Sequence, residues 1–309
     1  MDSLETIIIG AGPAGLSCAL ELQDCKIGYI VFEKSSRVGG QLWDMKSSVR
    51  NFVGGYSPGG ELTAQRLVDL ADVMKANVKF NANVEQVDLK LKTVVVNGHR
   101  HKAKYIVIAT GCRLKELPLP GTSIFSDSVF YRTAGKEAEF AGKKVAVIGG
   151  GDSALIQCLE LSQRSPQVHL IHRTSKLKAR PDLVTAVRSN PKINLLLETE
   201  VDSLIGQKRL AGLQVISSRS GEVRDIEAEC LLIKIGYMPN TEPFRGQVNM
   251  DSSGHIFIDQ NCQTNVPGVF AVGDLTNPGY PRIAVAAGHG TMAAAHIRTL
   301  FEGSVKKLN

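Results

Sequence analysis

Two segments of the chain carry the same pattern of an apolar strand, a glycine-rich turn and the start of a helix. The first is ETIIIGAGPAGLSCAL at residues 5–20, and the second is KKVAVIGGGDSALIQC at residues 143–158. A continuous apolar run before the glycines indicates a parallel strand that is buried on both faces. The free N–H groups at the start of the following helix favour anions such as the pyrophosphate of a dinucleotide. Two such turns predict an α/β fold with two Rossmann-like, three-layer dinucleotide-binding domains.

The first glycine turn, residues 10–15, has the full spacing of a dinucleotide fingerprint. Gly10 permits the tight turn, Gly12 lets the backbone approach the pyrophosphate, and Gly15 lets the helix pack close to its strand. A second strand, GYIVFE, ends in Glu33, whose carboxylate can accept both hydroxyl groups of an adenosine ribose. Strand, turn, helix, strand and acid in register form a specific signal, whereas a glycine pattern alone is a weak one.

The second glycine turn, residues 149–154, repeats these offsets with one change. Gly149 and Gly151 take the first two glycine positions, and Ala154 takes the third. Asp152 and Ser153 stand between Gly151 and Ala154 at the predicted start of the helix. Backbone N–H groups there are expected to face the pyrophosphate.

The strand after the second glycine turn ends in cations and not in an acid. QVHLIHR places His172 and Arg173 where the first domain has Glu33, with Arg180 further along. Cations at this point can pair with a ribose 2′-phosphate. The alternative is that they solvate a loop, as runs of charge usually do.

The second domain is predicted to be an insertion in the first. YIVIATG at 105–111 and VPGVFAVGD at 266–274 are two further buried strands, and the latter ends in Asp274. A carboxylate at the end of that strand can reach the ribityl or phosphate region of a cofactor. The sheet of the first domain is therefore expected to be completed from the far end of the chain.

The predicted domain boundaries lie in segments rich in proline and turn-forming residues. LKELPLPG and GYMPNTEPF have this composition, as expected where a chain passes between domains. We predict a first domain from residues 1–117 and 242–309 and a second from residues 118–241.

The charge and hydropathy of the chain indicate which kinds of partner it can bind. The formal net charge is +6, and no run of basic residues exceeds a pair, which favours phosphates or an acidic partner over nucleic acid. No apolar stretch approaches the roughly 20 residues of a membrane span, and the N-terminus lacks the layout of a signal peptide. We expect a cytoplasmic protein that contacts neither nucleic acid nor a membrane.

The cysteines are not arranged for redox exchange or for zinc. None of the six is followed by another at Cys-x-x-Cys spacing, and the seven histidines are scattered, so no metal site is predicted. The expected role of each cysteine is that of a small buried hydrophobe, although a bridge between cysteines distant in sequence stays open.

The chain resembles the thioredoxin-reductase-like flavoproteins, the class II pyridine nucleotide-disulfide oxidoreductases, over essentially its whole length. The matching landmarks are GAGPAG, GGQL at 39–42, ATG, VAVIGGGDSA, HLIHR, IGYMPNT and VPGVFAVGD, in this order and at this spacing. The resemblance implies an oxidoreductase and a homodimer. It also implies FAD in the first domain, with the flavin ring near Gln41, Asn51 and Arg282 to Ala284, and NADPH in the second domain. Further cofactor-binding positions implied by the resemblance are Pro13, Ala14, Lys34, Gly40, Leu42, Val84, Ala109, Thr110, Gly111, Gly273 and Ile283.

The chain departs from the family pattern in two places. Thioredoxin reductases carry a Cys-x-x-Cys pair shortly before the second glycine turn, and here Phe130 and Thr133 stand at those positions. The family's paired arginines after the histidine are reduced to Arg173 followed by Thr174, which weakens the prediction of a 2′-phosphate.

These departures favour one branch of the family. Our first hypothesis is a diflavin-linked disulfide oxidoreductase like those of photosynthetic bacteria, with a second FAD in the second domain and a dithiol or a small redox protein as partner. The alternative is a flavin reductase of the ferredoxin–NADP reductase type with NADPH in that site. Those enzymes usually carry a C-terminal extension, whereas this chain ends at LFEGSVKKLN. A non-catalytic flavoprotein redox sensor is a third possibility, which an intact second turn disfavours.

Four other residues carry two interpretations each. Trp43, Phe130 and Tyr131 can stack on a flavin, or they can fill the core or a dimer interface. His289 can relay protons near the flavin or can pack the last helix.

Overall fold

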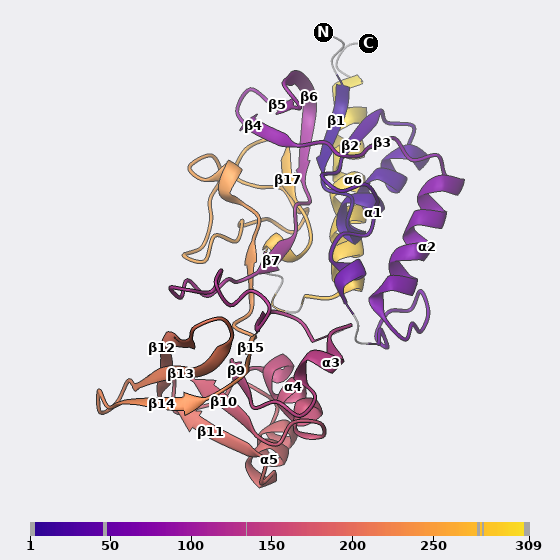
Figure 1. Cartoon of the computed structure of the whole chain (residues 1–309). Coiled ribbons are helices and arrows are strands. Elements are labelled where there is room, and N and C mark those ends of the chain that lie inside the picture. The colour runs from indigo at the N-terminus through magenta and orange to yellow at the C-terminus, as the bar shows by residue number, and fades with distance from the viewer. Residues whose placement is uncertain (1–3, 46–47, 134, 277–278, 280, 306–309) are drawn as a thin grey trace. The chain divides into compact units, whose positions relative to one another are not determined.

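The computed structural model describes residues 4–45, 48–133, 135–276, 279 and 281–305. The chain divides into two compact units (Figure 1). Unit 1 contains residues 1–113 and 238–309, and unit 2 contains residues 114–237. The crossings at 113/114 and 237/238 lie slightly before the predicted boundaries at 117/118 and 241/242. They fall in two short strands that pair with each other, β7 (Cys112–Leu114) and β16 (Tyr237–Pro239).

Unit 1 is built on a seven-stranded sheet with the order β3-β2-β1-β6-β5-β4, in which β17 also pairs with β6. The strands β3, β2, β1, β6 and β17 run parallel, and β4 and β5 extend β6 as an antiparallel meander. Strand β17 comes from the far end of the chain, as predicted. The strands are β1 (Leu4–Ile9), β2 (Tyr29–Phe32), β3 (Val78–Lys79), β4 (Val84–Asp88), β5 (Thr93–Val96), β6 (His99–Ile108) and β17 (Val269–Ala271).

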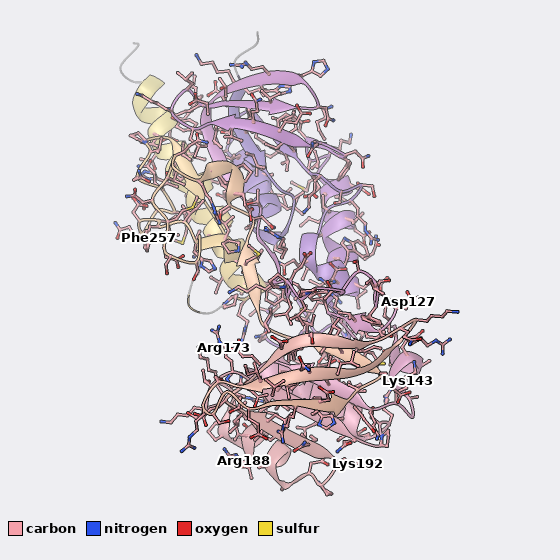
Figure 2. The ribbon with its side chains drawn as sticks, turned by 60° about the vertical axis from the view of Figure 1, so that its left-hand side comes forward. Asp127, Lys143, Arg173, Arg188, Lys192 and Phe257 are labelled. Atoms are coloured by element: carbon pink, nitrogen blue, oxygen red, sulfur yellow. The ribbon has the colours of Figure 1, made fainter. Side chains whose placement is uncertain are left out.

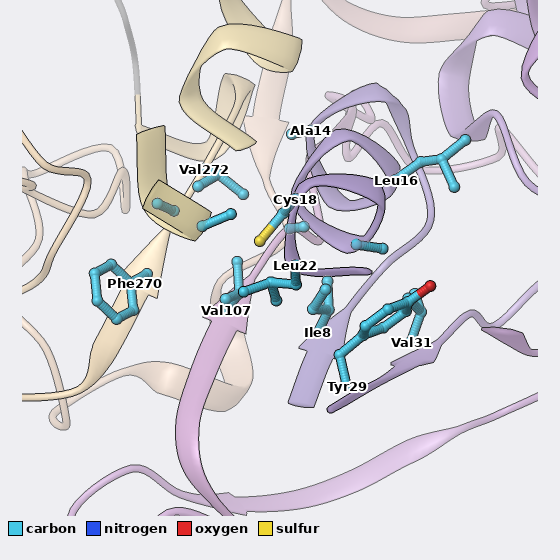
Figure 3. Close-up of a cluster of buried hydrophobic side chains, with 14 of the residues drawn as sticks. Ile8, Ala14, Leu16, Cys18, Leu22, Tyr29, Val31, Val107, Phe270 and Val272 are labelled. Carbon is cyan, nitrogen blue, oxygen red and sulfur yellow. The ribbon is translucent and has the colours of Figure 1, made fainter. Parts of the chain in front are cut away.

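One face of this sheet packs against helices α1 and α6. Figure 3 shows side chains of α1, among them Cys18 and Leu22, in one buried cluster with Val107 on β6 and Phe270 on β17. The other face is covered by the segment around Phe244 and Leu275, which gives the unit three layers. The helices are α1 (Pro13–Asp24), η1 (Gly40–Asp44), α2 (Gly60–Val73), η2 (Glu242–Phe244), η3 (Asp274–Thr276) and α6 (Ile283–Val305).

Unit 2 has a five-stranded parallel sheet with the order β11-β10-β9-β15-β8. Helices α4 and α5 pack on one face through a cluster that includes Leu155 and Val187. A three-stranded antiparallel sheet, β12-β13-β14, packs on the other face through Leu213 and Val215. The elements are β8 (Val129–Phe130), α3 (Glu137–Phe140), β9 (Val145–Ile148), α4 (Asp152–Ser162), β10 (Val168–His172), α5 (Pro181–Ser189), β11 (Ile193–Leu197), β12 (Thr199–Gly206), β13 (Leu210–Ser217), β14 (Val223–Glu227) and β15 (Cys230–Ile233).

Both units therefore place a central parallel strand, β1 or β9, directly before a glycine turn and a helix. This confirms the predicted fold class of two three-layer, Rossmann-like units, the second inserted in the first. Among the described residues, no helix is both long and apolar enough to span a bilayer.

Candidate dinucleotide-binding sites

The three glycines of the first turn have three different surroundings. Gly10 has a φ of +106°, and a Cβ there would lie 2.5 Å from the carbonyl oxygen of Ala109. A Cβ on Gly15 would lie 1.9 Å from the Gly10 oxygen, whereas a Cβ on Gly12 would meet no atom within 4 Å. Pro13 occupies the first turn of α1, where its missing N–H costs nothing. The turn is thus tight at its first glycine, closely packed at its third and open at its second.

Glu33, at the end of β2, is 5% exposed and is held beside the glycine turn. Its Oε2 accepts the N–H of Ala11 at 2.7 Å, and its Oε1 accepts the N–H and the hydroxyl of Ser35 at 2.9 and 2.8 Å. A carboxylate offers about four lone-pair positions, so Glu33 retains acceptor capacity for a ribose hydroxyl. Ser35, which was not predicted, orients the carboxylate, while the side chain of Lys34 is exposed.

The segment from Gly40 to Leu42 lies against the same turn. A Cβ on Gly40 would lie 3.3 Å from the Cα of Gly12, and one on Gly111 would lie 3.6 Å from the Nε2 of Gln41. Leu42 is buried below them in η1. The structure therefore brings Gly40 and Gln41 together with the turns after β1 and β6.

Asn240 is a site residue that the sequence reasoning missed. Its Nδ2 donates to the carbonyl of Thr110 at 2.8 Å, and its N–H donates to the carbonyl of Gly111 at 2.9 Å. The Thr110 hydroxyl donates in return to the Asn240 carbonyl at 2.7 Å. Asn240 thus orders the turn after β6, and its place in the IGYMPNT segment was the available signal.

The turn after β17 completes this carboxyl edge of the sheet. Gly273 has a φ of +83°, and a Cβ there would lie 3.1 Å from the Cβ of Ala14 on α1. The Gly273 N–H donates to Nδ1 of His289 at 3.4 Å. Burial lowers the pKa of His289 and raises the pKa of Asp274. His289 is therefore a neutral acceptor that positions the turn, which agrees with the helix-packing interpretation.

Val84 follows a segment that is hydrogen-bonded to the end of β2. It begins β4, two residues after Ala82, whose N–H donates to the Glu33 carbonyl at 2.9 Å. Val84 is thus two residues from a main-chain contact of Glu33, and its role beside a cofactor stays a prediction.

Several residues predicted to lie around the flavin ring are exposed in the structure. Asn51 is exposed within residues 49–57, a segment closed by an antiparallel bridge between its two ends. Arg282 is exposed, and its Nη1 donates to the Pro281 carbonyl at 2.8 Å. Ile283 and Ala284 form the first turn of α6. Their role beside a flavin stays a prediction.

Trp43 is occupied by contacts within unit 1. Its Nε1 donates to the Val38 carbonyl at 2.7 Å, and the guanidinium carbon of Arg37 lies 3.5 Å from the ring centroid. One face of the indole is thus already covered by a cation, which favours the structural interpretation of this residue.

The second glycine turn resembles the first in how much room each glycine position leaves for a side chain. A Cβ on Gly149 would lie 2.4 Å from the Lys234 carbonyl oxygen and 2.9 Å from the Cβ of Ala154. A Cβ on Gly151 would meet no atom within 4 Å. This turn too is open at its second glycine position, where a pyrophosphate would approach.

His172 packs on this turn. Its imidazole lies so close to Gly150 that a Cβ there would be 2.3 Å from the ring. Its Nε2 lies 2.9 Å from the Thr174 hydroxyl and 3.2 Å from the Lys176 carbonyl. Burial is the main cause that lowers the pKa of His172. This lowered pKa disfavours the charged imidazole, and the role of His172 at a 2′-phosphate stays a prediction.

The two arginines of the predicted clamp differ in their surroundings. Arg180 is tied to the start of α4: its N–H donates to Asp152 Oδ1 at 2.8 Å, and its Nε lies 3.3 Å from Asp152 Oδ2. Its Nη2 lies 3.7 Å from a carboxylate oxygen of Asp182. Arg173 projects from the surface of unit 2 (Figure 2), and Ser153 is exposed on the first turn of α4.

Phe130 and Thr133, which are predicted to stand where relatives carry a cysteine pair, are built into unit 2. Phe130 is 4% exposed within the core beneath α4. The Thr133 hydroxyl donates to Oε1 of Gln157 on α4, and the Tyr131 hydroxyl accepts the N–H of Leu117 at 3.4 Å. All three side chains therefore make structural contacts within their own unit.

All six cysteines are free thiols. Burial is the first cause of a raised pKa at five of them, and it brings the pKa to about 12 at Cys112 and about 11 at Cys230 and Cys262. The pKa is raised further still at Cys18 and Cys158. Since the thiolate is the species that attacks a disulfide, these five thiols are poor candidates for exchange at neutral pH.

Known proteins share this architecture and sequence. The profile of the pyridine nucleotide-disulphide oxidoreductases matches residues 4–290. Thioredoxin reductase of Streptomyces coelicolor is 34% identical over 304 residues, which covers 95% of this chain and 92% of that protein. The crystal structure of Lactococcus lactis thioredoxin reductase is 25% identical with a TM-score of 0.84, and covers 96% of this chain and 98% of that one. Thioredoxin reductase of T. acidophilum is 27% identical with a TM-score of 0.80, over 97% of this chain and 99% of its own. The chain therefore belongs to the pyridine nucleotide-disulphide oxidoreductase family, in its thioredoxin-reductase-like class, and is an FAD-dependent oxidoreductase.

Proposed function

We propose that this protein transfers electrons from NADPH, through FAD in unit 1, to an external acceptor without a dithiol of its own. The observation that carries the proposal is the pair of Phe130 and Thr133 built into unit 2, together with the absence of any Cys-x-x-Cys sequence. A disulfide relay needs a thiolate, and five of the six cysteines have raised pKa values.

The residues of unit 1 fit FAD. The open space beside Gly12 lies at the N-terminus of α1, where unpaired N–H groups favour a pyrophosphate. Glu33 is fixed to accept a ribose hydroxyl, and Gly273 brings Asp274 to the edge of the same sheet. FAD supplies hydride acceptance and electron delivery when bound. The chain's own residues hold the cofactor, orient it and keep its pyrophosphate at the helix terminus.

The residues of unit 2 favour NADPH over a dinucleotide without a 2′-phosphate. FAD and NADH both carry an unmodified adenosine ribose, and a carboxylate such as Glu33 suits that group. At the equivalent end of β10 the chain has Arg173 after His172, followed by Lys176 and Lys178, so three side chains there are cations. This cationic end suits a phosphate, and Arg173 is its exposed guanidinium.

A diflavin enzyme is the second candidate, because two of the three predicted clamp residues are already engaged. Arg180 is paired with Asp152, and His172 is packed on Gly150 with a pKa that burial lowers. A site with this reduced clamp also suits a second FAD, as the sequence-based hypothesis proposed. If NADPH is the ligand of unit 2, the protein is more similar in function to a reductase of the ferredoxin–NADP type than to a diflavin enzyme.

One set of measurements separates these functions. Purified protein is expected to contain one FAD per chain, to be bleached by NADPH within seconds under anaerobic conditions, and to leave thioredoxin disulfide unreduced in a coupled assay. Two flavins per chain with slow or absent NADPH oxidation would support the diflavin enzyme instead. A flavin that neither NADPH nor a dithiol reduces would support the redox sensor. Rapid reduction of thioredoxin would contradict the proposal, because it would require a pair of cysteines that accepts electrons from the flavin.

Three further expectations are based on the family resemblance and remain proposals. They are a homodimer, a small redox protein or a dithiol as partner, and a cytoplasmic location. Six unpaired cysteines suit a reducing compartment, where disulfides seldom persist.

A further inference from the structure

Lys234 lies directly beside the second glycine turn. It follows the last residue of β15, and its N–H donates to the Ile148 carbonyl at 2.7 Å. Its own carbonyl oxygen is the atom that a Cβ on Gly149 would meet at 2.4 Å. The main chain at Lys234 is therefore in contact with the turn that is expected to receive a pyrophosphate.

The side chain of Lys234 lies on the α4 side of the sheet. Successive residues of a strand point to opposite faces. In β15, Cys230 and Leu232 pack in the cluster beneath α4, whereas Leu231 and Ile233 pack in the cluster on the opposite face. Lys234 continues this alternation on the α4 side. It thus shares the face of the helix whose N-terminus lies at the glycine turn.

The Lys234 ammonium has little to compensate its charge. Its Nζ donates to the Tyr131 carbonyl at 3.4 Å. Among the described residues no carboxylate pairs with it, and burial and then Arg132 lower its pKa. A partly buried cation without a counter-ion loses solvation, and one long hydrogen bond to a carbonyl compensates little of that loss, so this position suits an anionic ligand.

The order of strands indicates which part of a dinucleotide passes Lys234. The adenosine ribose is assigned to the end of β10 by Arg173, and β10 lies on one side of β9. Strand β15 lies on the other side of β9, so the crevice between β9 and β15 is the point where the strand order reverses. A dinucleotide that starts at β10 and crosses the glycine turn therefore carries its second half toward β15.

We propose that the Lys234 ammonium binds the phosphate on the nicotinamide side of the dinucleotide in unit 2. The inference rests on the proposed function, because it requires a dinucleotide in this site. It assigns separate tasks to two cations: Arg173 recognises the 2′-phosphate, and Lys234 recognises the diphosphate.

Three oxidised or truncated ligands test this division on the FAD-loaded protein without turnover. They are NADP⁺, 2′-phospho-ADP-ribose, which keeps both bridging phosphates but lacks nicotinamide, and 2′,5′-ADP, which lacks the nicotinamide-side phosphate. We expect Lys234→Met to raise the dissociation constants of the first two ligands about tenfold in calorimetric titration, since a charge-assisted bond is lost. Binding of 2′,5′-ADP is expected to stay unchanged, whereas Arg173→Met weakens all three ligands.

Two further variants make the test specific. Lys192→Met removes an exposed charge from the same unit before the start of β11 (Figure 2), and it is expected to leave all three affinities unchanged. Lys234→Arg keeps the charge and is expected to retain most of the NADP⁺ affinity. If Lys234→Met does not fold, Lys234→Gln provides the same comparison with a polar side chain.

The outcomes separate this inference from the proposed function. Unchanged NADP⁺ binding in a folded Lys234→Met protein would overturn the inference while leaving NADPH as the ligand. Equal weakening of all three ligands would also overturn it, because the effect would not depend on the second phosphate. Wild-type protein that binds none of the three would overturn NADPH as the ligand of unit 2.

Discussion

Gly12 and Gly15 stand three residues apart, yet they serve different purposes. Gly15 leaves no room for a side chain, because a Cβ would lie 1.9 Å from the Gly10 carbonyl oxygen. Gly12 leaves room, since nothing lies within 4 Å of its Cβ position, and its φ of −71° is open to any residue. One glycine is thus required by the protein fold, and the other is required only by a ligand.

We predict that Gly12→Val folds but loses FAD, because the new side chain occupies the space of the pyrophosphate. Gly15→Ala is expected to unfold more easily even without cofactor, since the Gly10 turn must move. The ratio of flavin to protein absorbance and the thermal unfolding of both apo proteins check this. If the Gly12→Val protein keeps a full complement of FAD, the first glycine turn is not the site that binds the pyrophosphate.

Helix α6 shows how one element from the end of the chain completes the first site. Gly290 faces α1 so closely that a Cβ would lie 2.1 Å from the Ala14 carbonyl oxygen. Ser17 and Thr291 join their hydroxyls at 3.1 Å between the same two helices. On α6, His289 also accepts the Gly273 N–H, so the packing of α6 on α1 positions the turn that carries Asp274.

We expect Gly290→Ala to lower the free energy of unfolding of the apo protein by about 1–3 kcal/mol, the range for overpacking. Flavin occupancy is expected to fall with it, because the turn at Gly273 shifts. Gly288→Ala on the same helix is the matched control, since a Cβ there meets no atom within 4 Å. That control should be neutral or more stable by up to about 1 kcal/mol from helix propensity.

Denaturant titration of both apo proteins measures this difference. Equal stabilities for the Gly290 and Gly288 variants would show that the close contact between α1 and α6 does not constrain the unit.

At the scale of the whole molecule, the six cysteines are free thiols distributed over both units, and all but Cys25 are buried. Cys112 follows the turn after β6, and its pKa is raised to about 12 by burial and then by the nearby Asp274 carboxylate. Cys262 has a pKa raised to about 11, again mainly by burial. A thiol with a pKa of 11 or more is ionised in about one molecule in a thousand or fewer at pH 8.

We therefore predict that iodoacetamide at pH 8 alkylates the folded protein at Cys25 or at no cysteine, whereas protein unfolded in urea is alkylated at all six. The reactivity of the buried thiols should rise only as the pH approaches 11, where thiolate begins to form. Peptide mass spectrometry locates the label. Cys112→Ser and Cys262→Ser are expected to leave NADPH-driven flavin reduction unchanged. Rapid labelling of Cys112 or Cys262 in the folded protein would reopen a dithiol route.

The sequence was sufficient wherever a local backbone conformation or a buried strand set the outcome. Strand, glycine turn and helix are encoded within about 16 consecutive residues, so both turns, the insertion and the return of the chain through β17 could be predicted. That the chain contains no Cys-x-x-Cys sequence is likewise read from the sequence alone.

Only the tertiary structure decided which side chains are free to act, because their partners lie far away in the chain or on another element. His172 looks like a clamp residue in sequence, yet it packs on Gly150 and burial lowers its pKa. Arg180 is held by Asp152, which is 28 residues away. Asn240 orders a turn 130 residues before it, and Lys234 gains its place only because β15 pairs with β9. The charge and orientation of a side chain depend on burial and on such non-local partners, which no local pattern of residues encodes.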